Sequence, residues 1–280
     1  MTILHAIILG IIQGVAEFLP ISSSGHLVIT PYILNWSYQG LDFDIALHLG
    51  TIIAVIAYFW SDWIKIIGNA INLDSKSQPD FDKLIRVASD KKQKTEYPHN
   101  LFWIIIFASI PAAIAGYFLE NLAEHALRNP LLIAIFLAVF ALLLWLAESV
   151  GNNTTKIKDI GYAKGFIVGV AQAIALFPGV SRSGVTTTAG LFLNLNRSDA
   201  TKFSFLLATP AILGAFLVSL KNYSAVQIDL AFFIAVATSA IFGFLAIKYL
   251  LNFLEKHGFL PFVIYRLAVA AVVIGIYFLR

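Results

Sequence analysis

Long apolar runs are the feature that most constrains what this chain can fold into. Six runs approach the ~20 residues that a helix needs to cross a ~30 Å hydrocarbon core. They cover residues 45–60, 101–119, 131–147, 203–220, 229–247 and 259–279. We therefore predict an all-α polytopic membrane protein with six transmembrane helices, forming a single integral membrane domain over residues 1–280.

The charged residues support lipid as the solvent. Only 12% of the 280 residues are charged, whereas soluble domains carry about 25%. The net charge of +3 does not indicate a nucleic-acid partner, because the basic residues are dispersed among loops. With no cysteine in the chain, disulfides, thiolate metal sites and cysteine nucleophiles are excluded. We expect membrane lipid to surround this protein and no nucleic acid to bind to it.

Two further apolar stretches are interrupted. Residues 3–19 run into the cluster 20–25, and residues 165–177 run into the cluster 178–184, each rich in Pro, Ser and Gly. Such residues break a helix, and non-helical backbone at membrane depth is tolerated only where protein or a water-filled cavity surrounds it. We predict two re-entrant helix-loop-helix hairpins, at residues 3–34 and 165–196.

The two broken segments form an internal repeat. A shift of 159 residues lays residues 10–26 on 169–185, and seven of these 17 positions are identical, including a Gln and the Ser-x-Ser-Gly run. We expect one repeat half over about residues 1–147 and the other over about 160–280.

The distribution of Lys and Arg predicts the orientation. With loop 61–100 in the cytoplasm, 14 basic residues lie inside and three outside, while Arg182 and Arg266 stay in the membrane. This asymmetry follows the positive-inside rule. Three spans separate the hairpins, so the first enters from outside and the second from the cytoplasm, which is an inverted-topology repeat. Both termini are predicted outside.

Aromatic residues near the span ends fit a belt at the membrane interfaces, although packing explains any single one equally well. These residues are Trp60, Trp63, Trp103, Tyr117 and Trp145.

Two ionisable residues within apolar stretches are candidates for function. Glu17 precedes the first Ser cluster and Arg182 lies in the second, so they share one site if the hairpins meet. A purely structural ion pair is the alternative. Gln13 lies four residues before Glu17 and shares its helix face. With a substrate phosphate and waters, these two side chains could hold a hard cation; a helix-packing hydrogen bond is the alternative.

The Ser clusters have the design of anion sites, because the N–H groups of a following helix would point back at each cluster. The first contains Ser22, Ser23, Ser24, Gly25 and His26, and the second contains Ser181, Arg182, Ser183, Gly184 and Thr186. Together they indicate phosphoryl transfer on a lipid-borne phosphate. Helix capping and hairpin packing are the alternative for any single serine.

Two other polar residues receive structural interpretations. We favour His48 as a hydrogen-bonded packing residue, the alternative being that it lines a cavity mouth with Asp44. We interpret Arg266 as a partner for backbone carbonyls or a phosphate.

At these clusters the chain resembles the undecaprenyl-diphosphate phosphatase family of bacterial membranes, the bacitracin-resistance type. The motifs are Gln13–Leu27 and Pro178–Thr186, and the resemblance extends to Phe203–Ala208 and Pro261–Arg266. The family has Glu or Gln at the Gln13 position and Glu at the Glu17 position. Because Gln13 leaves one carboxylate here, the sequence counts against a mechanism with two acidic metal ligands.

The resemblance implies hydrolysis of a polyprenyl diphosphate lipid, undecaprenyl diphosphate, to undecaprenyl phosphate and inorganic phosphate. The reaction is expected at the outer face of the bacterial plasma (inner) membrane, where it recycles the carrier for peptidoglycan and confers bacitracin tolerance. A divalent cation, Mg or Ca, is implied as the cofactor. Whether the protein forms a homodimer is left open.

The expected mechanism begins with attack by Ser23, activated by His26 or Glu17; the choice of Ser23 over Ser22 rests on the family pattern. Arg182, Thr186 and the hairpin N–H groups would stabilise the phosphate, and a cation near Glu17 and Gln13 would neutralise the leaving group. Attack by a metal-bound water is the alternative. The remaining residues expected to bind phosphate are Ser22, Ser24, Gly25, Ser181, Ser183 and Gly184.

Two other functions compete with this one. The inverted repeat also suits a secondary transporter or flippase for undecaprenyl phosphate. Type 2 phosphatidic acid phosphatases share Ser-Gly-His and Ser-Arg elements, but they need a His where this chain has Thr188.

Overall fold

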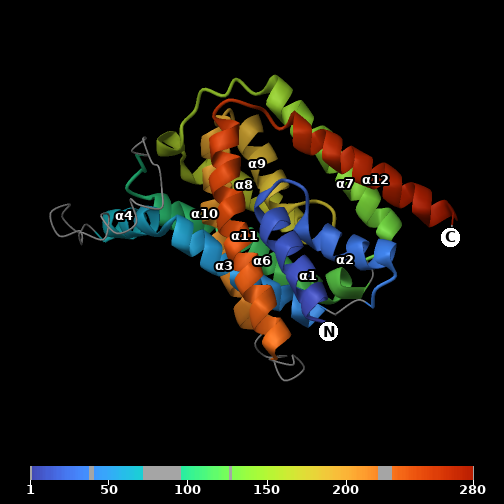
Figure 1. Cartoon of the computed structure of the whole chain (residues 1–280). Helices are drawn as coiled ribbons and strands as arrows, with labels where there is room; N and C mark the ends of the chain where they lie inside the picture. The colour runs from blue at the N-terminus through green and yellow to red at the C-terminus, as the bar shows by residue number, and fades with distance from the viewer. Residues whose placement is uncertain (1, 38–40, 72–95, 126–127, 220–228, 280) are drawn as a thin grey trace.

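The computed structural model describes residues 2–37, 41–71, 96–125, 128–219 and 229–279. In these ranges every regular element is helical, apart from an isolated bridge between Thr155 and Leu195. The helices, shown in Figure 1, are α1 (Ile3–Phe18), α2 (Ser23–Leu34), α3 (Leu41–Tyr58), α4 (Trp60–Ala70), α6 (Leu101–His125), α7 (Pro130–Val150), η2 (Ile157–Asp159), α8 (Tyr162–Ile174), α9 (Arg182–Phe192), α10 (Arg197–Ser219), α11 (Leu230–Leu254) and α12 (Leu260–Leu279).

Five described helices are long and apolar enough to cross a membrane: α6, α7, α10, α11 and α12. A sixth span is reached only if α3 and α4 are taken together, and their axes differ by 71°. The run 45–60 therefore does not form one straight helix. The predicted loop 61–100 is also partly wrong, because α4 occupies residues 60–70. Residues 72–95 of that loop lie outside the described residues.

Both interrupted segments form a helix, a short break and a second helix. The first pair spans residues 3–34, and the second spans 162–192. Ser22 and Ser181 occupy equivalent positions before α2 and α9, with positive φ values of 76° and 73°. Each hydroxyl accepts a hydrogen bond from the N–H three residues later. Capping, the structural alternative for these two serines, is therefore observed at both breaks.

Each broken helix packs along a long helix from the other half of the chain. Helix α1 lies beside α11, and α8 lies beside α6 (Figure 1). A Cβ atom at Gly10 would lie 2.6 Å from Ala235 O, and one at Gly169 would lie 2.0 Å from Ala108 O. These two glycines are equivalent in the repeat, so the same small residue permits both close approaches.

The aromatic residues expected at the interfaces divide into two groups. Trp60, Trp103, Trp145 and Tyr117 are exposed, with Tyr117 81% exposed. Trp63 instead packs against the main hydrophobic core, so its role is packing.

Candidate active site

Glu17 and Arg182 meet between the two breaks. Arg182 Nη2 lies 2.7 Å from Glu17 Oε1, and the two side chains are only 13% and 6% exposed. Glu17 lies in the last turn of α1, and Arg182 is the first residue of α9. Because a buried charge is costly without a partner, this ion pair ties the two broken helices together and fixes a charged centre at their junction.

The second oxygen of Glu17 gathers three further side chains. Ser23 Oγ donates to Glu17 Oε2 over 2.6 Å, and Gln13 Nε2 donates to it over 3.2 Å. His48 Nε2 lies 3.5 Å from the same oxygen. Helix α3 thus brings the ring of His48 to the carboxylate, so the polar partner expected for a packing His is Glu17. The sequence did not identify that partner.

Gln13 leaves its amide oxygen buried and without a hydrogen-bond partner. The orientation of the amide follows from chemistry, since only the NH2 group can donate to a carboxylate. An acceptor of this kind normally finds a partner when buried. The oxygen atoms of Gln13 and Glu17 therefore suit a hard cation. Among the described residues, no group of three His, Asp or Glu side chains could hold a metal ion by itself.

The remaining serines connect the breaks. Ser22 Oγ accepts hydrogen bonds from Gly25 N over 3.3 Å and from Gly179 N over 3.1 Å. Ser183 Oγ donates in the reverse direction, to Leu19 O over 3.0 Å. The hydroxyl of Ser24 is 3.5 Å from that of Ser22. Ser181 caps α9 through Gly184 N over 3.1 Å. None of these four serines bonds to the carboxylate of Glu17 in the described part of the chain, whereas Ser23 does.

His26 points away from Ser23. Its Nδ1 is 2.8 Å from Ser22 O, its Nε2 is 2.7 Å from the hydroxyl of Tyr265, and the two rings are stacked. The structure thus places Glu17, rather than His26, against Ser23. Tyr265 received no role from the sequence, although it lies in a segment that carries the family resemblance.

Arg182 and Thr186 are held by α10. Arg182 Nη1 donates to Ser204 O over 3.3 Å, and Thr186 Oγ1 donates to Arg182 O over 2.7 Å. The hydroxyls of Thr186 and Ser204 are 2.6 Å apart. Ser204 is fully buried and also received no role from the sequence. These contacts fix the start of α9 and the guanidinium of Arg182.

Arg266 is completely buried and bonds only to backbone among the described residues. Its guanidinium donates to four carbonyls: Leu137 O, Pro20 O, Gly179 O and Val180 O, at 3.0–3.2 Å. Pro20 belongs to the first break, and Gly179 and Val180 belong to the second. The prediction of a backbone partner is confirmed, and α12 thereby fastens both breaks to α7.

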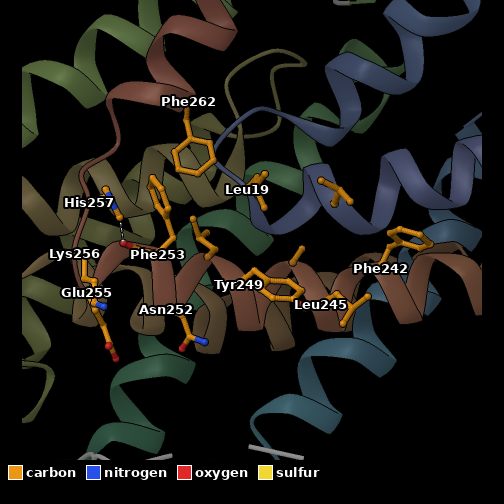
Figure 2. A pocket seen from close by; sticks show the side chains of 13 residues that line it. Leu19, Phe242, Leu245, Tyr249, Asn252, Phe253, Glu255, Lys256, His257 and Phe262 are labelled. Atoms are coloured by element: carbon orange, nitrogen blue, oxygen red, sulfur yellow. Dashed lines mark hydrogen bonds between the residues drawn. The ribbon is translucent and has the colours of Figure 1, made fainter. Parts of the chain in front are cut away.

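A separate groove of about 790 Å³ lies on the other side of α1 (Figure 2). Val15 and Leu19 line it, and Val15 points away from Gln13 and Glu17 because residues two apart lie nearly opposite on a helix. Its floor is α11, which is apolar from Phe242 to Phe253 except at Asn252, and the polar residues Glu255, Lys256 and His257 line it just past the end of that helix. The groove is therefore distinct from the charged centre.

These features define a multi-pass helical membrane protein with a polar centre where two broken helices meet. The family model for bacitracin resistance protein BacA matches residues 6–272, and the chain belongs to this family. It is 46% identical to an undecaprenyl-diphosphatase of Moorella thermoacetica, with all of both chains covered. It is 46% identical to an undecaprenyl-diphosphatase of Caldicellulosiruptor bescii, with 100% of this chain and 99% of the relative covered. For a relative of the same name in Pelotomaculum thermopropionicum the identity is 43%, over 98% of this chain and 96% of the relative.

Proposed function

We propose that this chain hydrolyses undecaprenyl diphosphate to undecaprenyl phosphate and inorganic phosphate, in peptidoglycan synthesis and bacitracin tolerance. Full-length relatives that carry the name undecaprenyl-diphosphatase support the reaction. The observation that carries it is the hydroxyl of Ser23, held 2.6 Å from a buried carboxylate oxygen of Glu17. A serine hydroxyl beside a base is the arrangement that nucleophilic catalysis requires.

The reaction starts with proton transfer from Ser23 to Glu17. As Ser23 Oγ bonds to the terminal phosphorus, Glu17 Oε2 takes the hydroxyl proton. The bond between that phosphorus and the bridging oxygen breaks, and undecaprenyl phosphate leaves with the electron pair. Glu17 passes that proton to the departing undecaprenyl phosphate and is a carboxylate again. Water then attacks the phosphoserine and gives a proton to Glu17, the bond between phosphorus and Ser23 Oγ breaks, and Glu17 returns the proton to Ser23 Oγ as inorganic phosphate is released. His26 takes no part in these transfers, because both its ring nitrogens bond elsewhere.

Arg182 stabilises the charge on the transferred phosphoryl group. Its planar fork suits phosphate oxygens, and the ion pair with Glu17 keeps it at the nucleophile. The N–H groups at the starts of α2 and α9 provide further donors to an anion. Thr186 acts through Arg182, whose backbone carbonyl it contacts, while Ser22 and Ser181 shape the two breaks as caps.

A divalent cation, Mg or Ca, is part of the proposal. Gln13 Oε1 and the carboxylate of Glu17 would hold it, since a buried amide oxygen without a partner lies beside the acid. When bound, the cation would supply positive charge to the diphosphate.

We also propose that the two broken pairs are re-entrant hairpins of an inverted repeat. The matching caps at Ser22 and Ser181 support this, as does the packing of Gly10 and Gly169 on helices of opposite halves. In this arrangement loop 61–100 is cytoplasmic, both termini are outside, and the site is reached from the outer face of the bacterial inner membrane.

Phosphate release from undecaprenyl diphosphate by the purified protein in detergent tests the function. A phosphatase releases inorganic phosphate without any gradient across a membrane, whereas a transporter or flippase does not. Geranylgeranyl diphosphate and free inorganic diphosphate provide comparison substrates. Cleavage of the lipid diphosphates supports the proposal, and absence of release from undecaprenyl diphosphate by well-folded protein contradicts it.

A further inference from the structure

Helix α4 carries two apolar stripes that face different surroundings. One stripe packs into the protein: Ile66 is buried and Trp63 packs against the main core, with the buried Asp62 beside them. The other stripe contains Trp60 and Ile67, which are 41% and 44% exposed, and ends at Ile71, which is 59% exposed. Because a soluble helix needs only one apolar stripe to face its core, the exposed stripe requires a partner of its own.

A third stripe of α4 is polar. Ser61, Lys65 and Asn69 follow one another at intervals of four residues, so they share one face of the helix. At about 100° per residue, this face lies opposite the boundary between the two apolar stripes. Helix α4 therefore presents polar groups on one side while Trp60 and Ile67 remain exposed on another. A boundary between water and lipid satisfies both sides at once.

The direction of α4 differs from that of the preceding helix. Its axis departs by 71° from that of Leu47–Tyr58, and Figure 1 shows α4 leaving the bundle at one edge. Trp60 lies at the bend, as aromatic residues do at membrane interfaces. Trp103, near the start of α6, is likewise 51% exposed, and α4 contacts α6.

We propose that α4 is an interfacial helix that lies in the plane of the membrane, with the stripe Trp60–Ile67–Ile71 buried in lipid. The partner is the boundary between headgroups and acyl chains, which accepts an apolar stripe on one side and Lys65 on the other. On the orientation proposed above, this is the cytoplasmic leaflet. Helix α4 would then anchor the cytoplasmic side of the bundle at a fixed depth.

The absence of cysteine from the chain permits a clean test in the full-length protein. Single cysteines are introduced by Trp60→Cys, Lys65→Cys and Ile67→Cys, labelled with a nitroxide, and reconstituted in phosphatidylcholine–phosphatidylglycerol vesicles. Collision with oxygen reports lipid exposure, and collision with a water-soluble nickel complex reports water exposure. Ile241→Cys, at a 60% exposed position in the middle of α11, provides the lipid reference.

The expected result is high oxygen collision at positions 60 and 67, at similar shallow depths, with nickel collision several-fold higher at position 65. A steady increase in depth from position 60 to position 67 would show that α4 continues a span and would overturn the proposal. Low collision with both reagents at position 67 would show that protein covers the stripe and would also overturn it. Phosphatase activity is not the readout, so failure of the proposed function leaves this test intact.

Discussion

Arg182 Nη2 lies 2.7 Å from Glu17 Oε1, although the two residues are 165 positions apart in the chain. The contact joins the end of one broken helix to the start of the other. Since Glu17 also accepts the hydrogen bond from Ser23, one carboxylate connects the proposed nucleophile to Arg182, the proposed phosphate-binding side chain.

Replacing Arg182 by Lys keeps the positive charge but removes the planar fork. We expect kcat/KM to fall at least tenfold, with little loss of folding stability, because Lys can still pair with Glu17. Arg197→Lys is a matched control, since Arg197 pairs with Glu148 between α10 and α7 and has no proposed role in catalysis. Comparable activity in both variants would refute the phosphate-binding role of Arg182.

Replacing Arg182 by Met should instead affect stability. The carboxylate of Glu17 would be left buried without its charged partner, and breaking a buried pair in this way costs about 3–5 kcal/mol. Thermal unfolding in detergent should show a lower midpoint than that of Arg182→Lys. Equal midpoints for the two variants would contradict a structural contribution from the ion pair.

Replacing Glu17 by Gln removes the proposed base while keeping the size of the side chain. General-base catalysis contributes about 10²–10⁴-fold, so kcat should fall by at least 100-fold. The matched variant His26→Gln should retain a larger share of kcat, because His26 bonds to Ser22 and Tyr265 and not to Ser23. The opposite order of activities, measured as phosphate release, would make His26 the base.

Replacing Gln13 by Leu removes the unpartnered amide oxygen. If Gln13 helps to hold the cation, the Mg or Ca concentration that restores half of the activity after chelation should rise several-fold. The kcat at saturating cation should change less. An unchanged cation dependence, or full activity of the wild-type protein in excess chelator, would remove the cation from the proposal.

Replacing Arg266 by Lys tests how the breaks are positioned. A lysine cannot reproduce the four carbonyl contacts from the first break, the second break and α7. We expect a lower kcat with a smaller change in KM, because the residue positions both breaks without lying at the nucleophile. A change in KM alone would indicate direct contact with substrate instead.

The sequence predicted the broken helices and most of the charged centre. Pro20, the Ser-x-Ser-Gly runs and the repeat indicated where α1 and α8 end, because these residues disfavour a continuous helix. Two isolated intramembrane charges, Glu17 and Arg182, indicated the pair, because each charge needs compensation in lipid.

The remaining site residues depend on packing that local sequence does not encode. His48 reaches Glu17 because α3 packs against α1, and Tyr265 reaches His26 from the far end of the chain. The bend at Phe59 was also missed, since residues 52–60 are apolar throughout and contain no Pro or Gly. Hydropathy measures whether a segment prefers lipid but does not give its direction.

Phosphate release by the Ser23→Ala variant tests whether Ser23 is the nucleophile. Ser109→Ala is the control, because among the described residues the hydroxyl of Ser109 donates only to Ile105 O within its own helix. With undecaprenyl diphosphate as substrate, we predict at least a 100-fold loss of kcat for Ser23→Ala and near wild-type turnover for the control. Near wild-type turnover by Ser23→Ala would contradict nucleophilic attack by Ser23.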